Sequence, residues 1–455
     1  METEKIKKLQ AARILSEAND LKRTIPALAK DIDMDISYLR EIVRGNAPLK
    51  KMYGVIKKMG KRYSIDVSDL FIFEDDCANG VKIMRAQTSE KTARIFNRNN
   101  SSGEKTPYYE YRDTAMSRAA PFKPEWIKEL RVVDNSDPYN SEVVYNNGHF
   151  MHQLTFFIGP VNFYWEINGK KFCSEMNTGD SNYITPYWPH SFASRDKNKT
   201  ALILAVTFGG DARRAQKEIY LLGNRAHEYV FDSRNPNKAV VQLIKQHMQN
   251  ENLTPRSLQE IFDTLSINVD VGRLLDETQQ KTPEEIQAIA KISHIDPSNL
   301  YVHLYNKEEE VVVKRTCDQD VRFYPNKDAP LYTLYPLART SKLPFMKGFA
   351  IEITTQQNPM NYPLNNSLHA WIYNYGVTPA IFYWMEGGEQ FQETLYPGDS
   401  VYIQPFIMYG FSNFEDGHAK LCSIGVFGSI HGATQRELSS FSDIKKIIEY
   451  ECWFD

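Results

Sequence analysis

An internal duplication limits the possible folds of this chain more than any other feature of its sequence. Three motifs recur at one constant offset of 219 residues: Phe163-Tyr-Trp165 as Phe382-Tyr-Trp384, Gly179-Asp-Ser181 as Gly398-Asp-Ser400, and Tyr183-Ile-Thr-Pro186 as Tyr402-Ile-Gln-Pro405. A constant offset over three motifs indicates duplication rather than chance. The chain is therefore expected to fold as two copies of one unit.

Each copy begins with helical sequence and continues with strands. Residues 27–39 and 288–300 align without gaps, and both have the apolar spacing of a helix-turn-helix. The Gly-Asp-Ser turn, a strand ending in Pro and a Pro-His-x-Phe segment resemble the second motif of a cupin, a small jelly-roll barrel. We therefore expect an α+β protein with a tandem repeat: a first helix-turn-helix domain (1–75), a first cupin (76–232), a second helix-turn-helix-like domain (233–310) and a second cupin (311–455).

Composition and charge limit where in the cell this protein is expected and which classes of partner it is expected to bind. No apolar run reaches the ~18 residues that a membrane span needs, and the charged start is not a signal peptide. We expect a cytoplasmic protein that does not bind membranes. The five cysteines form no C-x-x-C pair, which argues against a disulfide framework or a zinc knuckle. The formal net charge of -3 gives no general attraction to nucleic acid.

The duplication provides an internal control for metal ligands. At the offset of 219, the candidates His149, Gln153 and His190 of the first copy are replaced in the second by residues that bind no metal, namely Leu368, Ile372 and Tyr409. Three structural side chains have no reason to change together in this way. We expect one metal site in the first cupin and none in the second.

The ligand types favour non-haem Fe(II), because two imidazoles and an oxygen donor leave coordination positions open; Mn, Ni and Zn fit less well. Gln153 would be a neutral third ligand, so the metal would keep its full +2 charge and attract an anionic substrate. Four residues along a straight strand span ~13 Å, so a bend or bulge is expected between Gly148 and Met151. Glu142 and Glu175 are alternative third ligands that more simply face solvent.

At this point the sequence resembles a small family of iron-dependent phosphonate enzymes that includes hydroxypropylphosphonate epoxidase, 2-hydroxyethylphosphonate dioxygenase and methylphosphonate synthase. The likeness covers nearly the whole chain and rests on the helix-turn-helix and on three motifs: Asn146 to Gln153, Pro189 to Phe192, and Tyr108 to Tyr111. The epoxidase has a Glu at the Gln153 position, and the dioxygenase has a Glu six residues before the second His, where this chain has Ile184. Both carboxylate positions are empty here, which is the pattern of the methylphosphonate-forming branch.

The resemblance implies O₂-dependent cleavage of the C1–C2 bond of 2-hydroxyethylphosphonate at Fe(II), giving methylphosphonate and carbon dioxide without 2-oxoglutarate. By motif matching, Asn146, Tyr109 and Tyr111 would reach the phosphonate or the bound oxygen, with Arg98 as the candidate arginine if a loop is inserted at 99–106. Lys22 matches a family lysine that projects over the site, either from its own or from a neighbouring subunit. Gln153, Tyr111 and Lys22 are the catalytic candidates, and a homo-oligomer is expected.

Three other functions compete with this one. Cleavage to hydroxymethylphosphonate and formate differs from the first only in the residues at positions 153 and 184. A transcriptional regulator has the same domain layout, but the cluster Lys307-Glu-Glu-Glu310 would repel DNA, so we expect no nucleic-acid partner. A zinc-dependent cupin isomerase or structural binding protein would satisfy the two histidines but would not need the open, positive site.

Overall fold

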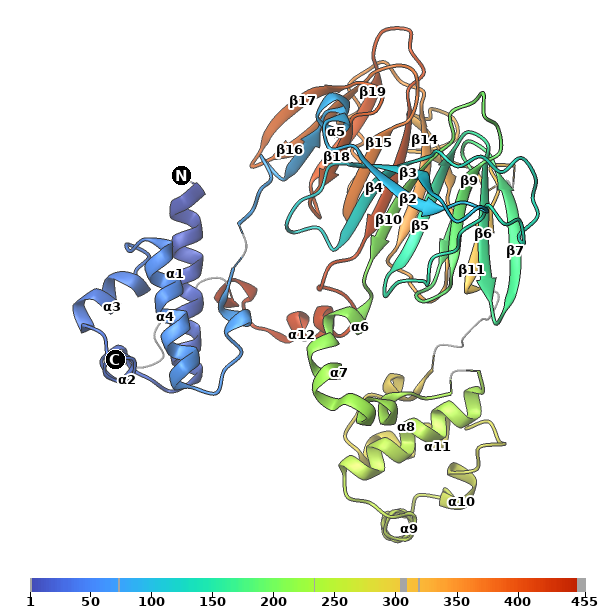
Figure 1. Cartoon of the computed structure of the whole chain (residues 1–455). Helices are drawn as coiled ribbons and strands as arrows, with labels where there is room; N and C mark the ends of the chain where they lie inside the picture. Colours follow the sequence, from blue (N-terminus) through green and yellow to red (C-terminus); the bar gives the residue numbers. More distant parts are fainter. Residues whose placement is uncertain (1, 73, 233, 303–308, 318–319, 448–455) are drawn as a thin grey trace.

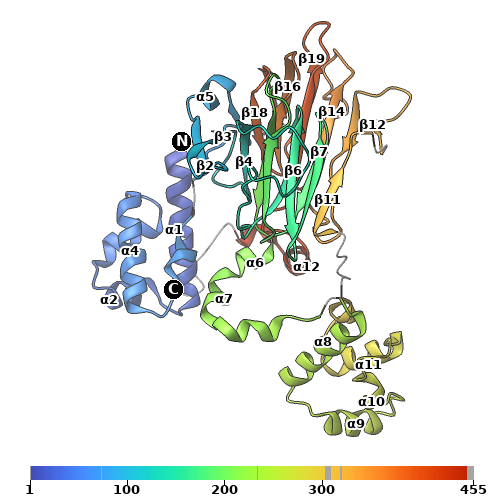
Figure 2. The same ribbon diagram turned by 45° about the vertical axis from the view of Figure 1, so that its right-hand side comes forward.

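The computed structural model describes the chain apart from residues 1, 73, 233, 303–308, 318–319 and 448–455. The strands form one body, and two helical bodies lie beside it (Figures 1 and 2). Helices and strands therefore occupy separate segments of the chain, as the sequence predicted. None of the helices in the described part of the chain is long and apolar enough to cross a bilayer.

The first helical body is closed by its own apolar core, which includes Ile14, Leu39 and Ile56. The side chains of Thr24 and Asp35 cap the two helices that cover the predicted helix-turn-helix, α2 and α3. The elements of this body are α1 (Glu2–Asp20), α2 (Ile25–Asp31), α3 (Ile36–Val43), α4 (Leu49–Arg62) and the 3₁₀ helix η1 (Val67–Leu70).

The second helical body differs from the first where the two copies should match. Its segment 288–300 consists of the end of α11 followed by a single 3₁₀ turn, η3, where the first copy has the full helix α3. A linker of short, exposed helices precedes it. The linker elements are α6 (Asp211–Arg214), α7 (Gln216–Leu222) and η2 (Gly223–Tyr229), and the body consists of α8 (Pro236–Asn250), α9 (Pro255–Thr264), α10 (Val271–Leu274), α11 (Pro283–Ile292) and η3 (Pro297–Leu300).

The strand body contains two seven-stranded and two three-stranded antiparallel sheets. The first pair has the orders β11-β8-β5-β10-β4-β3-β2 and β7-β6-β9, and the second pair β1-β18-β15-β20-β14-β13-β12 and β17-β16-β19. The strands of the first half are β1 (Val81–Met84), β2 (Arg94–Asn99), β3 (Lys105–Asp113), β4 (Phe122–Glu129), β5 (His152–Ile158), β6 (Val161–Ile167), β7 (Lys170–Met176), β8 (Ser181–Ile184), β9 (His190–Ser194) and β10 (Leu202–Phe208).

The strands of the second half follow the same succession. They are β11 (Val311–Lys314), β12 (Arg322–Tyr324), β13 (Tyr332–Pro336), β14 (Lys347–Ile353), β15 (His369–Asn374), β16 (Ala380–Glu386), β17 (Glu389–Leu395), β18 (Ser400–Ile403), β19 (Met408–Asn413) and β20 (Lys420–Val426). Besides the two helical bodies and the linker, the described part of the chain contains the short helices α5 (Ala86–Glu90), α12 (Ala433–Ser440) and η5 (Ile444–Ile447).

Three apolar cores hold these sheets together. One core includes Phe157 and Phe163 and lies between the sheets of the first half; a second includes Phe382 and Ile372 and lies between those of the second half. The third joins the two halves, because alternate residues of the long sheets, such as Leu204 of β10 and Trp371 of β15, share one cluster. Each half is therefore a two-layer barrel-like unit, called here the first and the second barrel.

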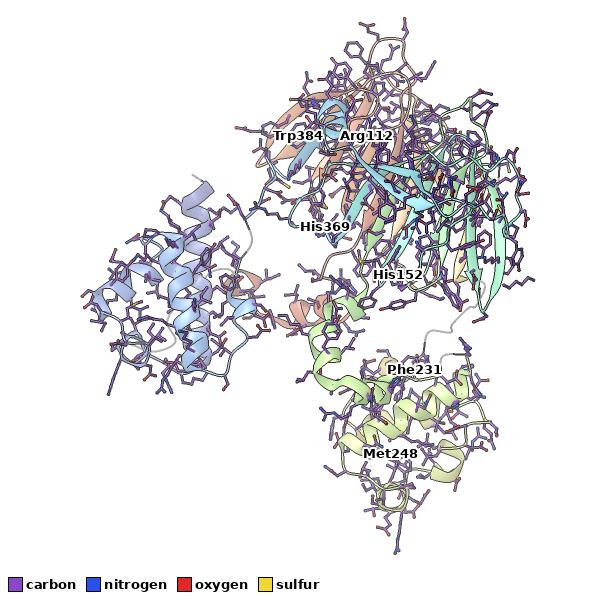
Figure 3. The ribbon with its side chains drawn as sticks, viewed as in Figure 1. Arg112, His152, Phe231, Met248, His369 and Trp384 are labelled. Carbon is purple, nitrogen blue, oxygen red and sulfur yellow. The ribbon has the colours of Figure 1, made fainter. Side chains whose placement is uncertain are left out.

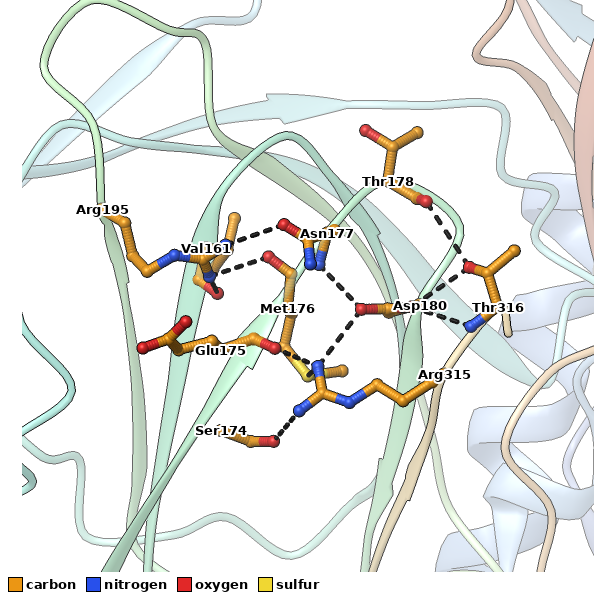
Figure 4. Close-up of polar contacts among 10 residues, drawn as sticks. All are labelled: Val161, Ser174, Glu175, Met176, Asn177, Thr178, Asp180, Arg195, Arg315 and Thr316. Carbon is orange, nitrogen blue, oxygen red and sulfur yellow. Dashed lines mark hydrogen bonds and ion pairs between the residues drawn. The ribbon is translucent and has the colours of Figure 1, made fainter. Parts of the chain in front are cut away.

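The two barrels exchange their first strands. Strand β1 pairs with β18 of the second barrel, and β11 pairs with β8 of the first. Arg315, just after β11, donates from Nη1 to Asp180 at 3.2 Å, and the next backbone N–H donates to the same carboxylate at 2.8 Å (Figure 4). Arg85, just after β1, makes the same contact with Asp399 at 2.9 Å. The repeated Gly-Asp-Ser motif therefore anchors the exchanged strands through its aspartate.

Candidate active site

A cavity of about 430 Å³ opens in the first barrel, and most of the predicted site residues line it. They are Arg98, Tyr109, Tyr111, Asn146, His149, Gln153 and His190. Lys22 is the exception: it follows α1 in the first helical body, in a turn with φ of 54°, where its Nζ donates to the carbonyl of Asn19 at 3.3 Å. Its suggested place over the site stays a prediction.

The three predicted metal ligands converge from two strands. Gln153 lies on β5 and His190 begins β9, while His149 lies in the segment just before β5. The imidazole centroids of His149 and His190 are 5.2 Å apart and nearly perpendicular, and Nε2 of His149 lies 3.3 Å from Oε1 of Gln153. The bend expected between Gly148 and Met151 is present, but as a turn before β5 rather than as a bulge within a strand.

Gly148 makes this turn possible. Its φ is +71°, and a Cβ at this position would lie 2.4 Å from the carbonyl carbon of Tyr187. Both the backbone conformation and the lack of space therefore require glycine. The chain then bends at Phe150 and Met151, which brings the side chains of His149 and Gln153 together.

Backbone carbonyls fix the proton on both imidazoles. Nδ1 of His149 donates to the carbonyl of Met151 at 3.0 Å, and Nδ1 of His190 donates to that of Trp188 at 2.9 Å. A carbonyl oxygen only accepts, so each ring carries its proton on Nδ1 and has a lone pair on Nε2. Burial also lowers the pKa of His190 to about 4, which keeps the ring neutral near pH 7.

The donor set fits a divalent cation. The lone pairs of His149 Nε2 and Gln153 Oε1 face each other at 3.3 Å without a proton between them, an unfavourable contact that a shared cation would relieve. The Gln153 amide donates from Nε2 to Thr155 at 2.9 Å, which directs its oxygen toward the histidines. Such hydrogen bonds behind metal ligands are typical of built metal sites.

The other candidate ligands lie elsewhere. Glu142 accepts from Arg131 Nη1 at 2.6 Å, and Glu175 is an exposed residue of β7. His152 points away from Gln153: its Nδ1 is 2.7 Å from the hydroxyl of Tyr183, as His369 is 2.6 Å from that of Tyr402 in the second barrel (Figure 3 labels both histidines). His152 is therefore a packing residue that lies outside the ligand set.

His152 and His369 occupy equivalent positions in the two barrels, and this equivalence corrects the sequence alignment. In the first barrel, Gln153 lies opposite Ile184 on the neighbouring strand. The residue that corresponds to Ile184 in the second barrel is Ile403, and Ala370 lies opposite it. Ala370, at an offset of 217, therefore replaces Gln153; the expectation of Ile372 was wrong. The connection from β15 to β16 is longer than the one from β5 to β6, and a gapless alignment cannot detect this. The second copy still offers no ligand at this position.

Ile184 is the direct cross-strand neighbour of Gln153. The two positions at which the resemblance places a carboxylate are therefore adjacent in space, although they lie 31 residues apart in the sequence. Ile184 is fully buried in the core of the first barrel. An apolar residue fills the second of these positions, so the amide of Gln153 is the oxygen donor at this end of the cavity.

Asn146 aims a donor into the cavity. Its Oδ1 accepts the backbone N–H groups of Gly148 and His190, at 2.9 and 3.0 Å. This fixes the amide so that Nδ2 faces Nε2 of His190 at 3.0 Å. An amide held in this way is suited to donate to an anionic oxygen next to the metal position.

Arg98 reaches the tyrosines through a hairpin. β2 and β3 pair with a bulge between Phe96 and Asn97, and Arg98 lies opposite Thr106. The guanidinium carbon of Arg98 lies 5.9 Å from the ring centroid of Tyr109. Its Nε is buried and has no hydrogen-bond partner in the described part of the chain. The ten residues between Arg98 and Tyr109 thus form the end of a tight hairpin.

The hydroxyls of the two cavity tyrosines differ in their surroundings. Tyr109 accepts the N–H of Phe192 at 3.0 Å, and Tyr332 of the second barrel accepts the N–H of Phe411 at 2.8 Å. Because the second barrel has no ligand set, this bond has a structural role that both copies retain. Tyr111 lies opposite Ile127 in the first barrel. At the equivalent place in the second barrel, Leu334 lies opposite Ile351. Tyr111 is therefore specific to the first barrel.

The substitutions Y109F and Y332F are expected to lower the free energy of unfolding by similar amounts, about 1–3 kcal/mol, because each leaves a buried backbone N–H without an acceptor. Y111F should leave stability nearly unchanged and weaken substrate binding. Chemical denaturation of the three variants checks this. A loss of substrate affinity in Y109F with full stability would contradict the structural role of this hydroxyl.

The sequence reasoning missed Glu129. This residue ends β4 opposite Tyr109, is 4% exposed, and has no hydrogen-bond partner for either carboxylate oxygen in the described part of the chain. Burial raises its pKa well above the ordinary value of 4.5. The matching residue opposite Tyr332 is Ile353, so the barrel without a ligand set has no such acid. A register-corrected comparison of the two copies would have found it.

E129Q is expected to change the pH dependence of stability. Because the folded-state pKa of Glu129 is raised, the unfolded state loses its proton first, and wild-type stability falls as pH rises above 4.5. Relative to E129Q, this loss is up to about 1.4 kcal/mol per pH unit until the folded-state pKa is reached. Denaturation at pH 5 and pH 8 measures it. Parallel pH profiles for the two proteins would show that Glu129 is ionised in the fold.

Known proteins resemble this chain over nearly its whole length. No family model matches the chain. A protein named methylphosphonate synthase, from Nitrosopumilus maritimus (strain SCM1), is 36% identical over 450 residues, covering 96% of this chain and 93% of that protein. The chain belongs to the methylphosphonate synthase family. A likeness over nearly the full length of both proteins includes both barrels and both helical bodies.

Solved structures extend the likeness to the fold. The structure of Streptomyces albus HEPD with 2-hydroxyethylphosphonate and Fe(II) bound has a TM-score of 0.88 and 31% identity, and the match covers 98% of this chain and 99% of that one. Native PhpD with cadmium atoms, at 14% identity and a TM-score of 0.73, covers 96% of this chain and 98% of its own and shows the fold alone. This family therefore shares its overall fold with proteins of much lower sequence identity.

Proposed function

We propose that this chain is a mononuclear non-haem iron oxygenase that cleaves the C1–C2 bond of 2-hydroxyethylphosphonate with O₂, giving methylphosphonate and carbon dioxide. The observation that carries the proposal is the convergence of His149, Gln153 and His190 in the cavity of the first barrel. The relative named methylphosphonate synthase and the HEPD structure with 2-hydroxyethylphosphonate and Fe(II) support it.

Fe(II), when bound, would supply open coordination positions and Lewis acidity for the substrate oxygens and O₂. The electrons for O₂ come from the substrate carbon that becomes carbon dioxide, so no 2-oxoglutarate is needed. Since Gln153 is neutral, the metal charge is not reduced by a protein carboxylate, which favours a dianionic substrate. Arg98, Asn146 and Tyr111 would hold the phosphonate from the cavity wall.

The proposal is tested by anaerobic reconstitution with Fe(II), followed by O₂ and 2-hydroxyethylphosphonate, with ³¹P NMR of the products. A methylphosphonate signal is expected. Hydroxymethylphosphonate together with formate would keep the iron site but assign the reaction to the dioxygenase branch. An unchanged substrate signal with iron shown to be bound would overturn the assignment.

We further propose that the two barrels are cupins, that each is preceded by a helix-turn-helix-type body, and that the boundaries are 1–75, 76–232, 233–310 and 311–455. The protein is expected in the cytoplasm as a homo-oligomer without a nucleic-acid partner. In α3, Arg44 donates to Glu41 at 3.1 Å, which reduces the charge that the helix would present to phosphate. If Lys22 acts, it reaches the substrate from its own or a neighbouring subunit, and K22A should then weaken substrate binding without changing iron content.

A further inference from the structure

The second barrel has its own cavity, at the position that corresponds to the catalytic one. Its volume is about 180 Å³, and its lining includes Ala370 and Tyr409 in place of Gln153 and His190. The pairing of β14 with β20 also places Lys347 where the first barrel has Lys123. Both lysines line their cavities. The second cavity has therefore lost the metal ligands but kept a cation.

Two arginines lie close to this lysine. The guanidinium carbons of Arg322 and Arg339 lie 5.9 and 5.3 Å from the ring centroid of Phe349, which lines the same cavity. Nε and Nη2 of Arg339 are buried and have no hydrogen-bond partner in the described residues. Burial and the neighbouring arginines lower the pKa of Lys347. Lys347 therefore lines one edge of a small cavity, with two further cationic side chains close to it.

The first barrel balances its charge where the second does not. Arg94, opposite Tyr111, pairs with Glu125 at 3.3 Å. In the second barrel, Arg322 lies opposite Leu334 and corresponds to Arg94. The position of Glu125, however, is taken there by the uncharged Phe349. In the described part of the chain, Arg322 pairs with the carboxylate of Asp320, which lies 3.9 Å away and is half exposed. Loss of the ligands was thus accompanied by loss of an anion, so that positive charge remains unbalanced.

The remaining walls define the size and polarity of a ligand. Leu334, Ile351, Leu364 and Leu368 make most of the lining apolar, with Ser423 among the few polar side chains. A volume of 180 Å³ accommodates a molecule of a few heavy atoms but not a nucleotide. A compact dianion fits the cationic edge, and a short alkyl group fits the apolar interior.

We propose that the second barrel is a non-catalytic binding site for a small tetrahedral phosphorus dianion, either inorganic phosphate or a short alkylphosphonate. The dianion contacts Lys347 and Arg339, with Arg322 at the edge. Occupancy neutralises the charge cluster and pairs the buried N–H groups of Arg339. The choice of methylphosphonate as a probe rests on the proposed function; the charge and size argument does not.

The test uses full-length, metal-free protein carrying R98M, so that binding in the catalytic cavity is weakened. Titration calorimetry with phosphate and with methylphosphonate is expected to show one saturable site per chain, weakened at least tenfold by R339M and by K347M. K420M is the matched control, because Lys420 is already paired with Glu352 at 2.7 Å on the surface. R339M removes a half-buried guanidinium whose Nε and Nη2 lack hydrogen-bond partners in the described residues, and it should not lower the melting temperature.

Three outcomes decide the matter. Tighter binding of methylphosphonate than of phosphate assigns the site to an alkylphosphonate, and equal binding assigns it to the phosphoryl dianion alone. No saturable binding of either probe, or equal binding by R339M, K347M and K420M, overturns the proposal. Failure here together with normal turnover of 2-hydroxyethylphosphonate by the wild-type enzyme would leave the proposed function intact, and the two failures are thus distinguished.

Discussion

H190A is expected to lose iron and turnover together, with activity at least about 10³-fold lower. The side chain supplies one of the two imidazole rings that line the cavity, and its Nδ1 bond to the carbonyl of Trp188 aims the lone pair of Nε2 at the metal position. Removing it leaves Gln153 and His149 as a weak, two-donor site. A bound metal stabilises charge by several kcal/mol in such reactions, and each 1.4 kcal/mol is tenfold in rate.

The measurement is iron content after anaerobic reconstitution, alongside ³¹P NMR of the product. H369A is the control, because His369 is a half-buried histidine that also has a lowered pKa and is held by the hydroxyl of Tyr402, but lies in the barrel without a ligand set. H369A should keep one iron per chain. Full iron binding in H190A, or loss of iron in H369A, would show that the metal lies elsewhere.

R98M is expected to raise KM by about 100-fold and to change kcat much less. The Arg98 guanidinium lies beside aromatic rings in the cavity, its carbon 5.3 Å from the ring centroid of Phe96, and its buried Nε is unpaired. A bound phosphonate dianion would accept from it. Two charge-assisted hydrogen bonds at about 1.5 kcal/mol each account for a factor of this size.

Steady-state kinetics of R98M, R98K and R94M check this expectation. R98K keeps the charge but loses the planar fork, so its KM should lie between those of wild type and R98M. R94M removes a cation that is already paired with Asp113 at 2.7 Å, and should bind substrate normally. Equal KM values for R98M and wild type would remove Arg98 from phosphonate binding.

Much of the candidate site follows from sequence because the duplication compares two copies of one unit. The loss of every ligand from the second copy marked His149, Gln153 and His190 without any structure, and all three line one cavity. The bend near Gly148 was also predictable, since strand geometry forbids two ligands four residues apart on a straight strand. The α+β class followed in the same way from apolar periodicity, which is a local property of the chain.

Other features depend on pairing between distant residues, which the sequence does not contain in readable form. A two-residue shift of β15 from the offset of 219 changed the counterpart of Gln153 from Ile372 to Ala370, and only the strand register revealed it. The hydroxyl of Tyr109 is bonded to β9, and Glu129 is buried opposite it without a partner. A pattern of alternating residues cannot distinguish such positions from an ordinary strand face.

The exchange of β1 and β11 between the barrels is another feature that depends on pairing between residues far apart in the sequence. The sequence determined that there are two copies, what each contains and which one kept its ligands, because these properties depend on the residues themselves. Tertiary structure decided which strand completes which sheet, which tyrosine is structural and which cavity keeps unbalanced charge. These depend on register and burial, and both are set by contacts between residues far apart in the chain.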